Sequence, residues 1–119
     1  VELRRSMINV SPVGRSCSRE EREEFFKYDK EHKIREGLCK QMAAELERHK
    51  LQAVIGGQIS IDVFPLGWDK TYCLQHLRES KIVFFGDMTE FGGNDFEIYN
   101  HHRVSGVRVS GPDDTLRRV

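Results

Sequence analysis

Three arginines in the first part of the chain are candidates for binding an anion. Arg15 falls in a turn, Arg22 falls near the start of a predicted helix, and Arg4 lies a short distance before them. The amides at a helix N-terminus carry partial positive charge, and the fork of a guanidinium group matches the oxygens of a phosphate. The alternative is a solvated helix face on which these arginines pair with neighbouring glutamates.

Ser60 and Asp62 form a second candidate group, because they lie two positions apart in a predicted strand over 58–64. Side chains two apart on a strand project from the same face, so this hydroxyl and this carboxylate point together. Such a pair suits the hydroxyls of a sugar or a phosphate group. The alternative is the solvent face of an antiparallel sheet, whose intervening isoleucine and valine residues face the core.

The strongest candidate is the loop that follows the apolar run over 81–85. Asp87 comes directly after this predicted strand, where an open parallel sheet presents its ligand-binding edge. A carboxylate at that place is suited to Mg²⁺, which commonly takes one or two protein carboxylates together with water and phosphate oxygens. Asn94 and Asp95 begin the next predicted helix and would orient the ion's ligands. The alternative is that these residues only form a turn and a helix cap.

Lys70 lies close to the same predicted crevice, within the string Gly67-Trp68-Asp69-Lys70. A lysine there would neutralise the charge of a phosphate or an aspartyl-phosphate, although most lysines are simply solvated. The adjacent pair His101-His102 is a weak metal candidate, because neighbouring histidines rarely converge on one ion.

The elements expected to position the candidate residues of the first half are two helices and several strands. Residues 1–13 suggest a strand or hairpin. Ser18 and Glu21 form a capping box that begins a helix. Its expected buried face is Phe25, Phe26 and Tyr28. A second helix carries apolar residues four apart, at Ile34, Leu38, Met42 and Leu46. Strands over 51–55 and 58–64 flank Gly56-Gly57, a pair that suits a tight hairpin.

The second half begins after Pro65 and Gly67, where the pattern changes. We expect a short helix over 69–77, a strand over 81–85 covered on both faces, a helix capped by Asn94, a strand over 104–109 and a terminal helix from Asp113. The predicted fold class is therefore α/β with an α+β part: residues 1–66 form an α+β domain, and residues 67–119 form part of a parallel sheet.

Composition narrows the class of protein. The 119 residues are 38% hydrophobic and 32% charged, which is typical of one soluble domain or parts of two. Lys plus Arg and Asp plus Glu are both 19, and the resulting net charge of zero argues against a general nucleic-acid binder. No apolar run is long enough for a membrane helix. Three widely spaced cysteines predict reduced thiols in a cytoplasmic protein.

Five strings in this chain together resemble the eukaryotic phosphomannomutase family of the haloacid dehalogenase superfamily. They are NVSPVGRSC (9–17), GGQISIDVFP (56–65), GWDK (67–70), FFGD (84–87) and GGND (92–95). The resemblance covers essentially the whole chain. It implies interconversion of mannose 6-phosphate and mannose 1-phosphate for GDP-mannose synthesis, with Mg²⁺ and a sugar 1,6-bisphosphate activator. It also implies a doubly wound core, an α+β substrate-binding cap, and homodimers formed through the caps.

The resemblance also implies roles for individual residues. Arg4, Arg15 and Arg22 match cap arginines that hold substrate phosphate and sugar, and Ser60 and Asp62 match cap residues that bind phosphate and hydroxyls. Lys70 matches the core lysine that steadies the phospho-aspartate, and Asp87 matches the Mg²⁺ carboxylate.

Two departures from the family pattern stand out. His101 and Val104 occupy positions where the family usually has an Asp and a Thr that help to bind a further structural cation. The superfamily's Asp-x-Asp-x-Thr motif, which holds the nucleophile and the acid/base, does not occur here. We therefore expect the C-terminal portion of such an enzyme, inactive without the missing motif. The alternatives are a non-catalytic sugar-phosphate-binding module and a sugar phosphatase of the same superfamily.

Overall fold

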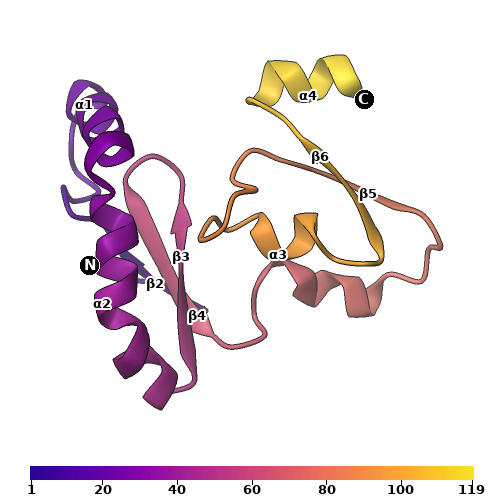
Figure 1. The fold of residues 1–119 in the computed structure, drawn as a ribbon, viewed down its shortest axis with the longest axis horizontal. Helices are drawn as coiled ribbons and strands as arrows, with labels where there is room; N and C mark the ends of the chain where they lie inside the picture. Colours follow the sequence, from indigo (N-terminus) through magenta and orange to yellow (C-terminus); the bar gives the residue numbers. More distant parts are fainter. The chain divides into compact units, whose positions relative to one another are not determined.

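The computed structural model describes residues 1–119 and contains two separate sheets (Figure 1). One is a four-stranded antiparallel sheet in the unit Val1–Leu66, and the other is a parallel pair of strands in the unit Gly67–Val119. The expected combination of an antiparallel part, a parallel part and helices is confirmed.

The sheet of the first unit has the strand order β1-β2-β4-β3. Its strands are β1 (Glu2–Leu3), β2 (Ile8–Val10), β3 (Leu51–Gly56) and β4 (Ser60–Pro65). The expected opening hairpin is the β1–β2 pair. The expected hairpin joins β3 to β4, but its turn covers 57–59, so Gly56 ends β3 and β4 begins two residues later than predicted. Gly57 has a φ of 60°, a left-handed conformation that glycine adopts without steric cost.

The two faces of this sheet differ in chemistry. Ile59, Ile61 and Val63 are buried, and Ile61 has no exposed surface at all. The helix α2 (Ile34–Arg48) packs against β3 and β4 (Figure 1). The residues that alternate with these, including Ser60 and Asp62, project from the opposite face, as expected for a strand.

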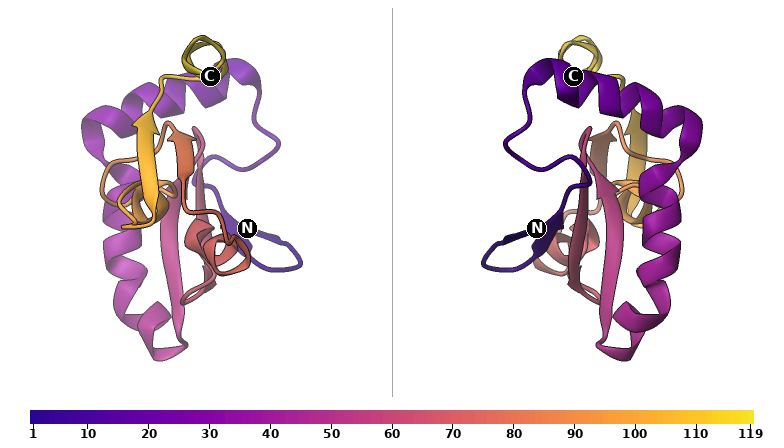
Figure 2. Two further views of the ribbon diagram at one scale, coloured as in Figure 1. Left: turned by 90° about the vertical axis from the view of Figure 1, so that its right-hand side faces the viewer. Right: turned by 90° about the vertical axis from the view of Figure 1, so that its left-hand side faces the viewer.

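The helix α1 (Arg19–His32) begins at Ser18 with the predicted capping box. The Glu21 amide donates to Ser18 Oγ at 3.2 Å, and the Ser18 amide donates to Glu21 Oε2 at 2.7 Å. The predicted buried face is wrong in part, because Tyr28 is 52% exposed and stacks on His32. The reason is that α1 crosses beyond the end of the sheet instead of lying along it (Figure 2), so the sheet does not cover Tyr28.

The buried stripe of α2 also differs from the expectation. Ile34 is exposed, and Arg35 is buried in its place at the start of the helix. From Arg35 the half-buried positions Cys39, Met42 and Leu46 follow at helical spacing. The prediction is wrong at Ile34 alone, because the other three predicted apolar positions are half-buried. It missed Arg35 because it counted apolar residues only.

The second unit carries short elements around two strands. They are a 3₁₀ helix η1 (Lys70–His76), β5 (Ile82–Gly86), α3 (Phe96–Tyr99), β6 (Val104–Arg108) and α4 (Pro112–Arg118). β5 and β6 are parallel neighbours, and α3 packs against both. The expectation that β5 is covered on both faces is wrong for Val83, whose side chain is largely exposed. The cap of α3 is Asp95 instead of Asn94, and α4 begins at Pro112 instead of Asp113.

In the described structure, none of the helices combines the length and the apolar character that crossing a membrane requires.

The capping box gives a direct test of how α1 is stabilised. Ser18→Ala should lower the free energy of unfolding by about 1 kcal/mol, because the Glu21 amide loses its acceptor. Ser16→Ala is the matched control, since Ser16 is exposed in the preceding turn and forms no side-chain hydrogen bond. Urea denaturation of the two variants compares them. Equal stability of both variants would contradict a role for the box.

Candidate functional site

A row of polar residues crosses the sheet of the first unit on the face opposite α2. Glu2 lies opposite Asn9, and Asn9 lies opposite Asp62. Asn9 Nδ2 donates a hydrogen bond to Asp62 Oδ1 at 2.7 Å. Ser60 shares this face because it lies two positions before Asp62. We call Glu2, Asn9, Arg15, Ser60 and Asp62 the polar face.

Two arginines, Arg4 and Arg15, lie together at one edge of the polar face. Arg15 Nη1 donates to Ser60 Oγ at 3.3 Å, and Arg15 Nε lies 3.8 Å from Glu2 Oε2. Arg4 Nε donates to the other oxygen of Glu2 at 3.0 Å. The Glu2 carboxylate therefore lies between two guanidinium groups. Both arginine side chains are nearly half exposed, so they keep N–H donors free for an anion.

The structure brings together four of the five candidate residues of the first unit. Ser60 is buried and Asp62 is half-buried, so this pair is not the plain solvent face of a sheet. Arg4 and Arg15 meet at Glu2, as described above. Arg22 is exposed on α1 and forms no ion pair or side-chain hydrogen bond.

Two buried atoms near this face have no hydrogen-bond partner. They are Asn9 Oδ1 and Ser11 Oγ. Buried polar atoms are nearly always paired, and leaving one unpaired costs about 1–3 kcal/mol. Neither Asn9 nor Ser11 was predicted as a site residue; Asn9 lies in β2, and Ser11 directly follows the end of this strand. This part of the sheet therefore holds more hydrogen-bonding capacity than the chain itself satisfies.

The sequence reading also missed a buried ion pair between Asp29 and Arg35. Arg35 Nε donates to Asp29 Oδ2 at 2.7 Å, and the Arg35 backbone amide donates to Asp29 Oδ1 at 2.8 Å. Arg35 is 2% exposed, so water does not screen this pair. In the sequence, the only local sign that Arg35 is buried is its helical spacing from Cys39 and Met42. Burial among these neighbours raises the pKa of the Cys39 thiol, despite the nearby Arg35 charge.

The same arginine reaches the turn between β3 and β4. Arg35 Nη1 lies 3.0 Å from the carbonyl oxygens of both Gly57 and Ser60, and 3.4 Å from that of Gly56. The start of α2 and the hairpin are thereby joined through one guanidinium group.

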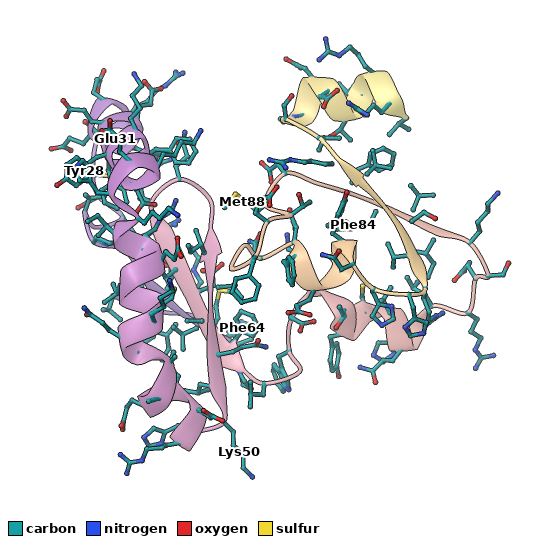
Figure 3. The ribbon with its side chains drawn as sticks, viewed as in Figure 1. Tyr28, Glu31, Lys50, Phe64, Phe84 and Met88 are labelled. Atoms are coloured by element: carbon teal, nitrogen blue, oxygen red, sulfur yellow. The ribbon has the colours of Figure 1, made fainter.

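In the second unit, Asp95 holds the loop that follows β5. Its Oδ1 accepts a hydrogen bond from Lys70 Nζ at 2.5 Å. Its Oδ2 accepts from the backbone amides of Asp87 and Met88 at 3.1 and 3.0 Å. Met88 and Phe84 mark this loop and the strand before it in Figure 3. Asp95 therefore contacts Lys70 directly and supports the backbone of Asp87.

Gly86 is required for this arrangement. A Cβ atom at position 86 would lie 2.7 Å from Asp95 Oδ2 and 2.6 Å from the Phe84 ring. The absence of a side chain allows the carboxylate to approach the end of the strand closely.

Asp87 itself is exposed at the carboxyl end of β5, and its carboxylate has no protein partner. Asn94 is half-buried and makes no side-chain hydrogen bond. No group of three or more His, Cys, Asp or Glu side chains that could hold a metal ion occurs in the structure. A lone carboxylate with free oxygens fits Mg²⁺ when water and phosphate supply the other ligands.

Two other features of the second unit are the adjacent histidines and a hollow beside Lys70. His101 and His102 stack at 4.4 Å between ring centroids, and His101 Nδ1 lies 3.2 Å from the Arg103 amide, which donates to it. A hollow of about 500 Å³ beside Lys70 is lined by Trp68, Tyr72 and Phe84 among others. Lys70 is itself one of the residues that line this largely apolar hollow.

This chain is similar to one family of known proteins along its whole length. The family model for eukaryotic phosphomannomutase matches residues 1–119. The chain is 56% identical over 122 residues to a phosphomannomutase of Encephalitozoon cuniculi, covering 100% of this chain and 48% of that protein. It is 55% identical over 120 residues to phosphomannomutase 2 of Dictyostelium discoideum, covering 98% and 48%, respectively. It is 54% identical over 119 residues to a phosphomannomutase of Nicotiana benthamiana, covering 99% and 47%. The chain spans about half the length of these curated relatives.

The role of Asp95 in holding the loop can be measured by amide hydrogen exchange. Asp95→Asn should speed exchange at Asp87 and Met88 about tenfold or more, because a hydrogen bond to a charged acceptor contributes roughly 1.5–3 kcal/mol. Asp87→Asn is the matched control, since its exposed side chain accepts neither amide. Unchanged exchange in Asp95→Asn would show that the loop is held by other contacts.

Proposed function

Because the chain belongs to the eukaryotic phosphomannomutase family, we propose that it forms part of an enzyme that interconverts mannose 6-phosphate and mannose 1-phosphate for GDP-mannose synthesis. The observation that carries the proposal is the polar face, where Arg15 meets Ser60 and Asn9 meets Asp62. A guanidinium group, a hydroxyl and a carboxylate on one sheet face are the groups that a sugar phosphate requires.

In this proposal the two units have different tasks. The unit Val1–Leu66 is the substrate-binding cap, and the unit Gly67–Val119 is the C-terminal part of a haloacid-dehalogenase-like core. The antiparallel sheet with its polar face supports the first assignment. The parallel pair β5–β6, with a carboxylate at the end of β5, supports the second.

The cap residues would bind the phosphate and the ring of the sugar. Arg4 and Arg15 would form charge-assisted hydrogen bonds with phosphate oxygens through their free N–H groups, and the exposed Arg22 would join them. The Ser60 hydroxyl would donate a hydrogen bond to the same phosphate. Asp62 would accept hydrogen bonds from sugar hydroxyls, while the Asn9 amide holds its carboxylate in place.

The core residues would act on the reacting phosphoryl group. Lys70 would stabilise its negative charge, and Asp95 would orient Lys70 through their ion pair. Asp87 would hold Mg²⁺, Asn94 would help to orient the ligands of the ion, and Asp95 would keep the surrounding loop in place. Bound Mg²⁺ supplies positive charge that stabilises a transferring phosphoryl group.

The nucleophile is proposed to lie outside these 119 residues. No aspartate of the chain occurs in an Asp-x-Asp-x-Thr motif. An aspartate carboxylate elsewhere in the enzyme would attack phosphorus, forming an O–P bond as the bond to the sugar oxygen breaks. A second carboxyl group would give that sugar oxygen its proton. A sugar 1,6-bisphosphate would act as the activator that supplies this phosphoryl group. The free hydroxyl of a sugar monophosphate would then attack the phosphorus and break the O–P bond to the aspartate, and the second carboxylate would take up the hydroxyl proton.

Two broader features belong to the same proposal. We propose a homodimer formed through the cap, supported by a hollow of about 550 Å³ on the first unit that exposes Val13 and Tyr28 beside Phe25. A cytoplasmic location is supported by three free cysteines, and the zero net charge gives no support for a nucleic-acid partner.

Binding of mannose 6-phosphate tests the role of the polar face. Arg15→Ala should weaken binding to the 119-residue chain by about 2 kcal/mol, roughly a thirtyfold rise in Kd, because charge-assisted bonds to phosphate are lost. Arg15→Lys should recover little, since lysine lacks the planar fork. Isothermal titration calorimetry measures both variants. Arg19→Ala is the control, because Arg19 is exposed and pairs with Glu23. Equal Kd values for Arg15→Ala and Arg19→Ala would refute the assignment.

Turnover tests where the nucleophile lies. The purified 119-residue chain, given mannose 1-phosphate, Mg²⁺ and the bisphosphate activator, should form no mannose 6-phosphate above background. A longer member of the family in the same coupled assay is the positive control. Turnover at a comparable rate would place the nucleophile within this chain and contradict the division of tasks.

A further inference from the structure

We propose that Arg35 is a positioning residue for sugar-phosphate binding. Held by the buried carboxylate of Asp29, it fixes the backbone of Ser60 so that the Ser60 hydroxyl meets Arg15 on the polar face. This inference rests on the proposed function, in which Ser60 and Arg15 contact the substrate phosphate.

The first step is the fixed orientation of the guanidinium group. Asp29 accepts from both the side chain and the backbone amide of Arg35, at 2.7 and 2.8 Å. The Arg35 side chain is almost entirely buried, so neither water nor a second rotamer competes with this arrangement. Asp29 therefore fixes the orientation of the Nε edge of the Arg35 guanidinium group at the junction between α1 and α2.

The second step is the contact between the other edge and the β3–β4 turn. Arg35 Nη1 faces carbonyl oxygens on both sides of that turn, those of Gly57 and Ser60 at 3.0 Å, with Gly56 at 3.4 Å. Gly57 is in the left-handed conformation, and glycine restricts a turn less than any other residue. The guanidinium group thus supplies the restraint that the turn residues themselves lack.

Ser60 links Arg35 to Arg15 through two different oxygen atoms. Its carbonyl oxygen accepts from Arg35, and its hydroxyl accepts from Arg15 at 3.3 Å, near the outer limit for such a bond. A backbone shift of a few tenths of an ångström would break the hydroxyl contact. The position of the Ser60 hydroxyl therefore depends on the bond made by its own carbonyl.

Lysine at position 35 separates positioning from simple stability. A lysine keeps the positive charge beside Asp29, but its single ammonium group lacks the plane that spans the carboxylate and the turn. Arg35→Lys should therefore keep the ion pair and the fold while releasing Ser60. Arg48→Lys is the matched control, because Arg48 lies on the same helix, is exposed and pairs with Glu45.

The experiment is a double-mutant cycle on the 119-residue chain, with Kd for mannose 6-phosphate measured by calorimetry. Arg35→Lys should raise Kd about tenfold, and Arg48→Lys should leave it unchanged. In a Ser60→Ala background, Arg35→Lys should raise Kd less than twofold, because its effect acts through Ser60. A wild-type Kd in Arg35→Lys, or the same tenfold effect without the Ser60 hydroxyl, would overturn the proposal.

Two additional measurements keep the proposal testable. If circular dichroism shows that Arg35→Lys is unfolded, Asp29→Asn takes its place in the cycle and is judged by the same criteria. If the wild-type chain does not bind mannose 6-phosphate, the proposed function fails, and the unliganded chain decides the positioning role. The NMR resonance of the Arg15 side-chain Nε–H should then shift in Arg35→Lys and not in Arg48→Lys. An unshifted resonance would overturn the positioning role by itself.

Discussion

The buried ion pair of Asp29 and Arg35 is the interaction on which the first unit depends. The chain turns between α1 and α2 at Lys33, whose φ of 52° is unusual for a residue other than glycine. The ion pair joins the residues on the two sides of this turn. Burying two charges costs several kcal/mol, and only a network of further hydrogen bonds offsets that cost. Here the Arg35 amide and the carbonyls of the β3–β4 turn supply those bonds.

The second unit uses a buried carboxylate in a comparable way. Asp95 is shielded from water, yet it holds the partly exposed Lys70 and the backbone from which the exposed Asp87 projects. In both units, one shielded carboxylate fixes the groups around it, and those groups lead to the residues at the surface. Under the proposed function, the residues that contact substrate would thus be oriented before substrate arrives, which lowers the entropic cost of binding.

Local signals in the sequence predicted local structure well. The capping box at Ser18 and the hairpin between β3 and β4 each depend on residues within a few positions of one another, and both are present, although the hairpin turn begins at Gly57. Burial was harder to predict, because apolar character says what a side chain prefers and not what lies opposite it, as Tyr28 and Val83 demonstrate. The partners within the sites were missed for a related reason. The hydrogen bond of Asn9 to Asp62 spans 53 positions, and no periodicity links residues so far apart.

The close approach of Asp95 to Gly86 has a consequence for how tolerance to mutation is interpreted. Position 86 carries no side chain and performs no chemistry, yet any larger residue there would collide with the carboxylate that supports the loop. A mutational scan would rank this glycine beside the acidic residues in importance. The intolerance of position 86 to substitution would reflect only how closely the Asp95 carboxylate approaches it. A glycine can therefore be required because its missing side chain leaves room for a neighbouring residue.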